Sequence, residues 1–412
     1  MMKFSKLLVA GCSLSVSLAW AQPVYDLPRL EGLAMESSHA VLAARDQVTA
    51  ARYAVDSAAA FPNPELEYLG GTARARSPGG NPGDAQSVTL TQPLDLPWRR
   101  AARIGGAEAA LAATTAATQG FEADLLARLR VRYFDVLRRQ ADLKNAREDV
   151  QLMDSVRSRI ALRVETGDAP RFELIKADAE ALNAQKTAQA AGFRVEQARS
   201  LLRQTVGGGL PADFMLSGQL ADVPDLLALD GLRQELGQNS PELARARAET
   251  VRAQRQLDLE RSQRWPNVAL KASVDEDPDI RTSKFGVVIS IPLWDRRRGP
   301  VGEAAAQLSR ARYELAAQEF SLGQGLEVAY QQYEIAQAQV TALESGIVRQ
   351  AESALKVAEA AYRFGERGFL EVLDAQRVYR AARVELIAAR FELASAWVEI
   401  ERLRASPRGK MQ

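Results

Sequence analysis

The chain contains two copies of one pattern, and this duplication limits its fold more than any other feature. The triplet Phe61-Pro62-Asn63 recurs as Trp265-Pro266-Asn267, and residues 88–94 (VTLTQPL) recur as residues 287–293 (VVISIPL). A third landmark, TGDAPRFELIKADAE, recurs as FGERGFLEVLDAQRV. Three landmarks in the same order predict an internal repeat, in which both copies build the same structural unit.

Between the first two landmarks of each copy, the hydrophobic residues recur with a period of two. Val268, Leu270, Ala272 and Val274 of the second copy alternate with polar residues. Runs of about ten residues match the length of tilted membrane-spanning strands. We predict strands at about 62–72 and 86–95 in the first copy and at about 266–275 and 284–293 in the second. A half-buried hairpin of a soluble domain would show the same alternation.

Aromatic side chains lie at the helix-proximal ends of the predicted strands. The four residues are Phe61, Trp98, Trp265 and Trp294. This position suits the interfacial girdle of a membrane barrel and favours the membrane interpretation. Past the N-terminal segment no window approaches the roughly 18 apolar residues of a spanning helix, so any crossing must use strands. Four strands cannot close a barrel and open edges are not tolerated in lipid, so three chains are the economical solution.

From residue 298 to residue 364 the hydrophobic period is that of a coiled coil. One seam consists of Val301, Leu308, Leu315, Leu322, Ala329, Ala336 and Leu343, and a second of Leu326, Tyr333, Val340 and Ile347. A helix of roughly 65 residues would be about 100 Å long, far more than a globular core needs. Turns at 166–170 and 365–368 end the long helices, and a second helix runs back from each turn.

These patterns divide the chain into five segments. They are a signal peptide (1–21), a first repeat (22–205), a linker (206–239), a second repeat (240–404) and a C-terminal tail (405–412). The signal has two interpretations, because Val9-Ala10-Gly11-Cys12 resembles a lipidation site and Ala19-Trp20-Ala21 an ordinary cleavage site. Cleavage after Ala21 leaves the apolar core of normal length, and lipidation of Cys12 is the alternative.

The reactive residues of the chain argue against most enzyme classes. The only cysteine is Cys12, inside the signal, and the only histidine is His39. The mature chain therefore offers no disulfide, thiol nucleophile or cysteine-based metal site, and no His-dependent triad is apparent. A formal net charge of +1 does not favour nucleic acid as a partner. We expect no enzyme activity, no cofactor and no resident metal.

Taken together, the pattern resembles the TolC-like outer membrane efflux proteins over essentially the whole mature chain. The segment GERGFLEVLDAQ (residues 365–376) is similar to the helix turn typical of this family. The stretches LTQPLDLPWRRAARI and SIPLWDRRRGPV most resemble the heavy-metal group, of the cobalt-zinc-cadmium type, which works with resistance-nodulation-division (RND) pumps.

The resemblance implies a mixed α and β membrane protein of the Gram-negative outer membrane. Its fold would be a trimeric twelve-stranded β-barrel, four strands from each chain, continuing into a long periplasmic α-helical coiled-coil tunnel. The trimer would dock on a periplasmic adaptor (membrane fusion) protein and an inner-membrane RND pump, and would conduct heavy-metal cations passively. Two alternatives are the same duct serving drugs or a secreted protein, and a soluble periplasmic coiled-coil scaffold.

The resemblance also assigns residues to a periplasmic aperture. These residues are Tyr362, Arg367, Glu371 and Asp374, with polar contacts of Tyr362 and Arg367 holding the mouth closed. Glu371 and Asp374 lie one helical turn apart, so threefold symmetry would make each a ring of carboxylates that attracts cations. The competing interpretation is that both acids belong to a solvated helix face. The expected adaptor contacts are Gly167, Asp168, Ala169, Pro170, Gly365, Glu366 and Gly368.

Arginines begin the helix that follows each strand pair. They are Arg99, Arg100 and Arg103 in the first copy and Arg296, Arg297 and Arg298 in the second. The positive end of the helix dipole disfavours cations there, so something must compensate. Lipid phosphates are one candidate, and pairing with Asp95 and Asp295 is the other.

Overall fold

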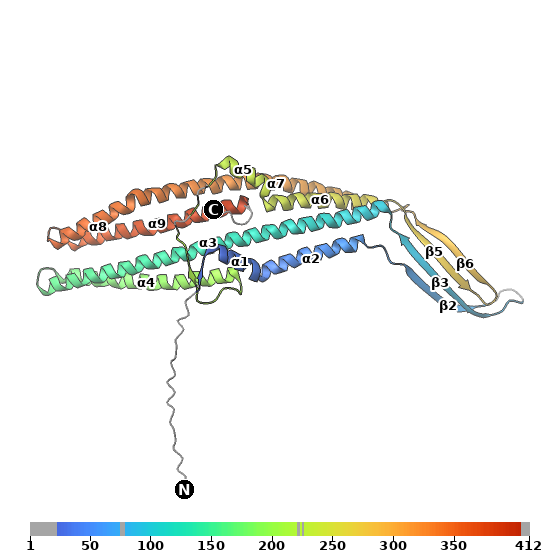
Figure 1. Cartoon of the computed structure of the whole chain (residues 1–412), viewed down its shortest axis with the longest axis horizontal. Helices are drawn as coiled ribbons and strands as arrows, with labels where there is room; N and C mark the ends of the chain where they lie inside the picture. The colour runs from blue at the N-terminus through green and yellow to red at the C-terminus, as the bar shows by residue number, and fades with distance from the viewer. Residues whose placement is uncertain (1–22, 75–78, 221–222, 225, 405–412) are drawn as a thin grey trace, which may run out of the picture.

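A computed structural model describes residues 23–74, 79–220, 223–224 and 226–404. The predicted signal peptide 1–21 with Cys12, and the predicted tail 405–412, lie outside the described residues. Figure 1 shows a long rod of helices with a β-sheet at one end and two helical hairpin tips at the other.

The two sequence repeats fold into two similar series of elements. The first consists of α2 (His39–Ala59), β2 (Glu65–Ala73), β3 (Gly83–Leu94), α3 (Pro97–Glu165) and α4 (Arg171–Val206). The second consists of α6 (Pro241–Ser262), β5 (Asn267–Glu276), β6 (Arg281–Ser290), α7 (Arg298–Ala342), the π-helical turn η1 (Leu343–Ile347), α8 (Val348–Arg363) and α9 (Phe369–Arg404). Each copy is therefore a helix, a strand hairpin, a long helix and a returning helix.

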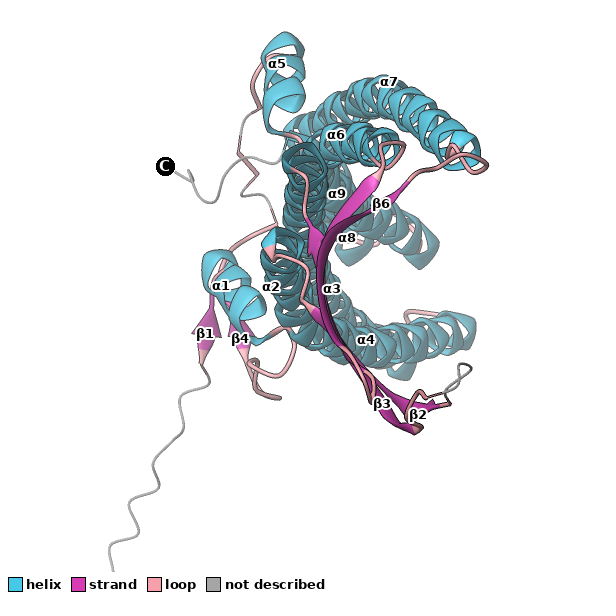
Figure 2. Ribbon diagram, turned by 90° about the vertical axis from the view of Figure 1, so that its right-hand side faces the viewer, coloured by secondary structure: helices cyan, strands magenta, loops and turns pink. Residues whose placement is uncertain are grey.

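Smaller elements flank the rod near its middle. Strands β1 (Val24–Tyr25) and β4 (Met215–Leu216) pair in parallel, beside α1 (Leu27–Ser37) and α5 (Leu229–Asn239). The segment 206–239, which the sequence suggested as a linker, therefore contains a strand and a helix. In Figure 2, β1, β4 and α1 lie outside the curve that the larger sheet follows.

The larger sheet places the two strand hairpins side by side. Its order is β2-β3-β5-β6, and every neighbouring pair is antiparallel. One cross-strand row, Leu66, Leu90, Ala272 and Phe285, is apolar; the adjacent row, Glu67, Thr89, Ser273 and Lys284, is polar. The large side chains of the apolar row are exposed. The sheet therefore has one uncovered apolar face, and β2 and β6 each have one neighbour.

The two largest of four buried clusters among the described residues lie near the middle of the rod and near the hairpin tips. Near the middle of the rod, Leu129, Leu202, Leu326 and Ile400 are completely buried, one each from α3, α4, α7 and α9. Near the hairpin tips, Ile160, Phe369 and Val372 belong to a second cluster. Burial of large aliphatic or aromatic side chains stabilises a fold by about 1.5–3 kcal/mol each. Within the described ranges, none of the helices combines the length and apolar character needed to span a membrane.

The long helix of the second copy is interrupted where the heptad pattern predicted continuity. At η1 the helix makes a single π turn, which accommodates one additional residue. The buried residues Leu125, Leu129 and Val136 of α3 match Leu322, Leu326 and Tyr333 of α7 at a spacing of 197 residues. Gly365 follows Gly167 by 198 residues, so the second copy is one residue longer over this part of the helix. The predicted seam residue Ile347 is 49% exposed, and Ala351 lies in the buried face beyond the turn. The π turn therefore restores helix phase after an insertion.

Arginines at the start of α3 contact the ends of two neighbouring helices. Arg103 Nε donates to the carbonyl of Ala58 at 2.7 Å, and its guanidinium pairs with Asp95 at 2.6 Å. Arg100 donates to the carbonyl of Ala59 at 2.7 Å, and Arg99 donates to carbonyls at the end of α6. Carbonyls at helix C-termini lack helical partners and attract cations. Contacts within the chain therefore compensate these three charges.

Candidate functional site at the helix tips

Both helical hairpins reach the same end of the rod, and their turns have the same geometry. Gly167 and Gly365 have φ angles of 82° and 76°, a conformation that favours glycine. Each glycine amide donates to the carbonyl three residues earlier, and the next amide donates to the carbonyl five residues earlier. This arrangement is the Schellman motif that ends many helices. Apart from the half-buried Ala169, the seven expected adaptor-contact residues are exposed.

Tyr362 occupies the inner side of the second tip. Its side chain is buried, and its hydroxyl donates a hydrogen bond to Glu173 Oε2 at 3.4 Å. The guanidinium carbon of Arg163 lies 4.8 Å from the centre of the ring, and the Phe369 ring lies 6.0 Å away. Burial, and secondarily the charge of Glu173, raise the pKa of Tyr362. The phenol therefore remains a donor that joins α8 to α4.

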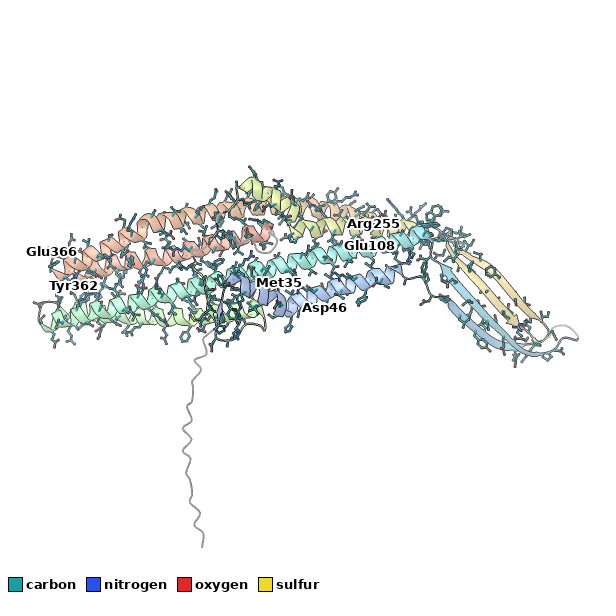
Figure 3. All side chains as sticks on the ribbon, in the orientation of Figure 1. Met35, Asp46, Glu108, Arg255, Tyr362 and Glu366 are labelled. Atoms are coloured by element: carbon teal, nitrogen blue, oxygen red, sulfur yellow. The ribbon has the colours of Figure 1, made fainter. Side chains whose placement is uncertain are left out.

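The other predicted aperture residues lie on the exposed part of the same tip. Arg367 Nη1 is 3.0 Å from Glu371 Oε2, one helical turn away, and both side chains are exposed. Such pairs contribute about 0.3–0.5 kcal/mol. Asp374 is exposed and has no ion-pair partner among the described residues. Figure 3 shows Tyr362 and Glu366 together at this end of the rod.

The structure thus divides the four predicted residues into two groups. Tyr362 is engaged with the first copy, whereas Arg367, Glu371 and Asp374 face solvent. The sequence pattern had given no sign of a role for Glu173 or for Arg163. The repeat alignment does match Glu173 with Glu371, but the contact of Glu173 crosses from one copy to the other, which an alignment of copies does not reveal.

The opposite end of the helices carries the predicted aromatic residues. Phe61, Trp98, Trp265 and Trp294 all lie between a helix and a strand or at the helix end, and all are exposed, Trp294 to 94%. The guanidinium carbon of Arg100 lies 4.7 Å from the centre of the Phe61 ring. The exposed aromatics therefore lie at the helical end of the sheet.

The acidic residues do not form a compact metal centre. Across the segments for which side chains are described, there is no group of three or more His, Cys, Asp or Glu residues that could hold a metal ion. His39 is exposed at the start of α2. The carboxylates at the second tip are instead spread along one exposed surface.

The sheet and the long helices together define a class of protein. A sheet with an uncovered apolar face is suited to a lipid environment, and helices of this length extend far beyond it. The chain therefore has the architecture of a membrane-anchored tunnel subunit.

Comparison with known sequences agrees with this class. The family model described as "Outer membrane efflux protein" matches residues 30–208 and 232–405, one segment for each copy. The chain belongs to the outer membrane efflux protein family. This is a family of transport channels rather than enzymes. Its members lie in the Gram-negative outer membrane, and their helical part extends into the periplasm.

Individual relatives and solved structures extend over most of the chain. The cobalt-zinc-cadmium resistance protein CzcC of Cupriavidus metallidurans is 28% identical over 90% of this chain and 88% of its own length. The nickel-cobalt-cadmium resistance protein NccC of Alcaligenes xylosoxydans xylosoxydans is 27% identical over 73% of this chain and 68% of its own. The open-state crystal structure of the Neisseria gonorrhoeae MtrE outer membrane channel superimposes with a TM-score of 0.78 at 19% identity, covering 92% and 89% of the two chains.

Proposed function

We propose that three copies of this chain form an exit duct that passively conducts heavy-metal cations across the outer membrane. The duct would receive its cargo from an inner-membrane RND pump through a periplasmic adaptor. The observation that carries the proposal is the four-stranded sheet with an apolar face and two unpaired edges. Unpaired edges are not tolerated in lipid, and three copies would supply the twelve strands of a closed barrel.

The surface of the second tip supports a cationic cargo. Glu366, Glu371 and Asp374 are exposed on this tip, and threefold symmetry would place three copies of each around one axis. Rings of carboxylates attract cations and repel anions. The names of CzcC and NccC, both metal resistance proteins, support the same cargo.

The two turns are the proposed contacts for the adaptor. They are exposed, they lie at the same end of the rod, and their shared Schellman geometry gives them a fixed shape. A rigid turn loses little conformational freedom when a partner binds. The proposal therefore assigns adaptor binding to 166–170 and 365–368, and cation selection to the helix surface immediately behind the second turn.

Growth and conductance measurements test the proposal together. The chain would be expressed with its own pump and adaptor in a Gram-negative host lacking equivalent channels, and tolerance to cobalt, zinc and cadmium would be measured. Glu371→Gln with Asp374→Asn should reduce cation selectivity and cation block in planar bilayers. Glu36→Gln with Asp46→Asn, exposed acids far from the tips, is the matched control. Increased tolerance to drugs but not to metals would mean that the duct exports drugs and not metal cations.

A further inference from the structure

The internal repeat specifies how neighbouring chains would join. Within one chain, β3 of the first copy pairs with β5 of the second, and Leu90 lies opposite Ala272. The equivalent edges between chains are β6 of the second copy and β2 of the first, and both are unpaired on their outer side. If β6 and β2 of neighbouring chains pair as β3 and β5 do within one chain, the sequence landmarks give the register between β6 and β2.

We infer that Ile289 of one chain lies directly opposite Tyr68 of the next chain in an antiparallel β6–β2 pair. The match of residues 88–94 with residues 287–293 makes Ile289 the counterpart of Leu90. The match of Pro62-Asn63 with Pro266-Asn267 makes Tyr68 the counterpart of Ala272. The inference rests on the proposed trimer and adds the partner edge and its register.

The faces of the two edge strands agree with this register. Ile289 lies opposite Val268 and Tyr68 opposite Val88, so both belong to apolar rows, and both are exposed in the single chain. A shift by one residue would place side chains of opposite faces next to each other, because the side-chain period of a strand is two. The pairing therefore continues the apolar face from one chain to the next.

The lengths of the strands give a second, independent observation. β3 extends to Leu94, whereas β6 stops at Ser290, three residues short of Leu293, the counterpart of Leu94. β6 ends there because its neighbour β5 begins at Asn267, which lies opposite Ser290. The inferred register places Ile291 opposite Leu66 of the next chain and so extends β6 to the length expected from the sequence.

Glycine at position 70 fits the same arrangement. In the inferred register Gly70 lies opposite Val287, next to the Tyr68–Ile289 pair. The Tyr68 hydroxyl lies 3.4 Å from the position that a Cβ of Gly70 would occupy, so the tyrosine ring covers the glycine. Aromatic covering of a strand glycine stabilises a sheet. This contact lies within β2, so it is compatible with the inferred register and does not determine it.

Disulfide trapping tests the register directly. The double variant Tyr68→Cys with Ile289→Cys would be oxidised in isolated outer membranes and examined on non-reducing gels. Directly opposed residues in antiparallel strands have Cα atoms about 4.5–5.5 Å apart, within the range of about 4.4–6.8 Å that disulfides span. Covalent dimers and trimers should form. A mixture of chains carrying only one substitution each should give dimers without trimers.

Displaced pairs provide the matched controls. The two hairpins of the chain differ from each other by two residues, because Glu65 lies opposite Thr91 but its counterpart Ala269 lies opposite Val288. Tyr68→Cys is therefore also combined with Val287→Cys and with Ile291→Cys. Their Cα atoms should be about 7–8 Å apart and should cross-link at least about tenfold less.

Two further samples complete the design. The chain without engineered cysteines gives the background. Leu90→Cys with Ala272→Cys, the equivalent pair inside one chain, should form a disulfide without producing dimers.

The outcomes separate the register from the proposed function. If a displaced pair cross-links more than Tyr68→Cys with Ile289→Cys, the inferred register is wrong, but the proposed trimer is still supported. Absence of cross-links from all three pairs, in a chain that light scattering shows to be trimeric, would overturn the inferred register and both registers displaced by two residues. A monomeric chain in outer membranes would overturn the proposed trimer as well.

Discussion

The hydroxyl of Tyr362 lies 3.4 Å from Glu173 Oε2, and this hydrogen bond connects the two copies at the tips of their helices. Tyr362 belongs to α8 and Glu173 to α4, so the contact ties the second long helix to the returning helix of the first copy. Phe369 packs beside the same ring. Separation of the two tips would require this contact to break.

Replacement of Tyr362 by Phe should therefore favour the open arrangement of the tips. Loss of one hydrogen bond costs about 1 kcal/mol, which corresponds to roughly a fivefold change in a two-state equilibrium. Single-channel recordings in planar bilayers should show a larger open fraction. Tyr313→Phe, at a tyrosine that is 77% exposed on α7, is the control and should behave as the parent chain. Equal open fractions for Tyr362→Phe and the parent would contradict this role.

Deletion of Gly346 from η1 should be tolerated. The π turn already absorbs one extra residue, so its removal restores a regular α-helix and leaves the residues beyond it in phase. Loss of a helical glycine should even add up to about 1 kcal/mol of stability. The deletion variant should assemble and complement export normally, as measured by trimer yield and metal tolerance.

Deletion of Lys144 from α3 is the contrasting variant. This helix is regular over its described length, so a deletion rotates everything beyond it by about 100°. Met153, Val156 and Ile160 would leave the buried cluster at the tips. We expect low yield and loss of export. Equal tolerance of both deletions would show that the π turn has no role in helix phase.

Replacement of Arg402 should destabilise the junction of the two copies. Arg402 on α9 donates to Glu242 at 2.6 Å and to Asp124 at 3.3 Å, on α6 and α3 respectively. A hydrogen bond to Glu399 is the main reason that its pKa is raised. Arg402→Gln would leave three carboxylates without their cation and should cost about 2 kcal/mol, measured by thermal unfolding in detergent.

An exposed arginine on α7 gives the control for this prediction. Arg310 pairs with Glu314 one turn away, and its side chain is largely exposed. Arg310→Gln should lower the stability by at most about 0.5 kcal/mol. A loss of similar size for both arginines would mean that Arg402 does not link the copies.

Two carboxyls of α3 should make the chain less stable as pH rises above their ordinary pKa of about 4. Burial raises the pKa of Asp142 and of Asp149 above the usual value of 3.8. A group with a higher pKa in the folded chain contributes stability below its unfolded pKa and loses it as pH rises through the folded pKa. Asp142→Asn with Asp149→Asn should raise the melting temperature at pH 7 and flatten its change toward pH 5.

The control for the pH experiment is Asp154→Asn, an exposed position of the same helix. It should leave both the melting temperature and its pH dependence unchanged. A double variant that melts below the parent chain at pH 7 would show that the two carboxylates stabilise the folded chain in their charged form.

The general architecture was predictable because two hydrophobic periods alternate along each copy. The period of two placed Leu270 and Val287 on one face of a sheet, where they lie opposite each other. The period of seven identified Leu326, which is completely buried. The end of β6 was not predictable from the same signal, because Ile291 and Leu293 continue the alternation where the single chain provides no neighbouring strand.

Contacts between copies were harder to predict than the copies themselves. Glu173 and Tyr362 come from different parts of the repeat unit, so neither an alignment nor a periodicity connects them. Asp95 was a predicted partner of these arginines and does pair with Arg103, but Arg100 and Arg103 also donate to backbone carbonyls, whose availability depends on where α2 ends. The spacing between the sequence landmarks falls from 199 residues at Val88 and Val287 to 198 at Gly167 and Gly365, so these landmarks did not reveal the extra residue of the π turn.

The single turn at η1 also affects how the molecule can change over evolutionary time. Because the additional residue is accommodated locally, α7 before η1 and α8 after it both keep their buried faces toward the neighbouring helices. The long helices of the two copies can therefore differ in length by one residue, and the shorter helix needs no matching change. An insertion of one residue at η1 preserves the packing of the neighbouring helices, whereas the same insertion elsewhere in the helix would rotate the whole hairpin tip beyond it.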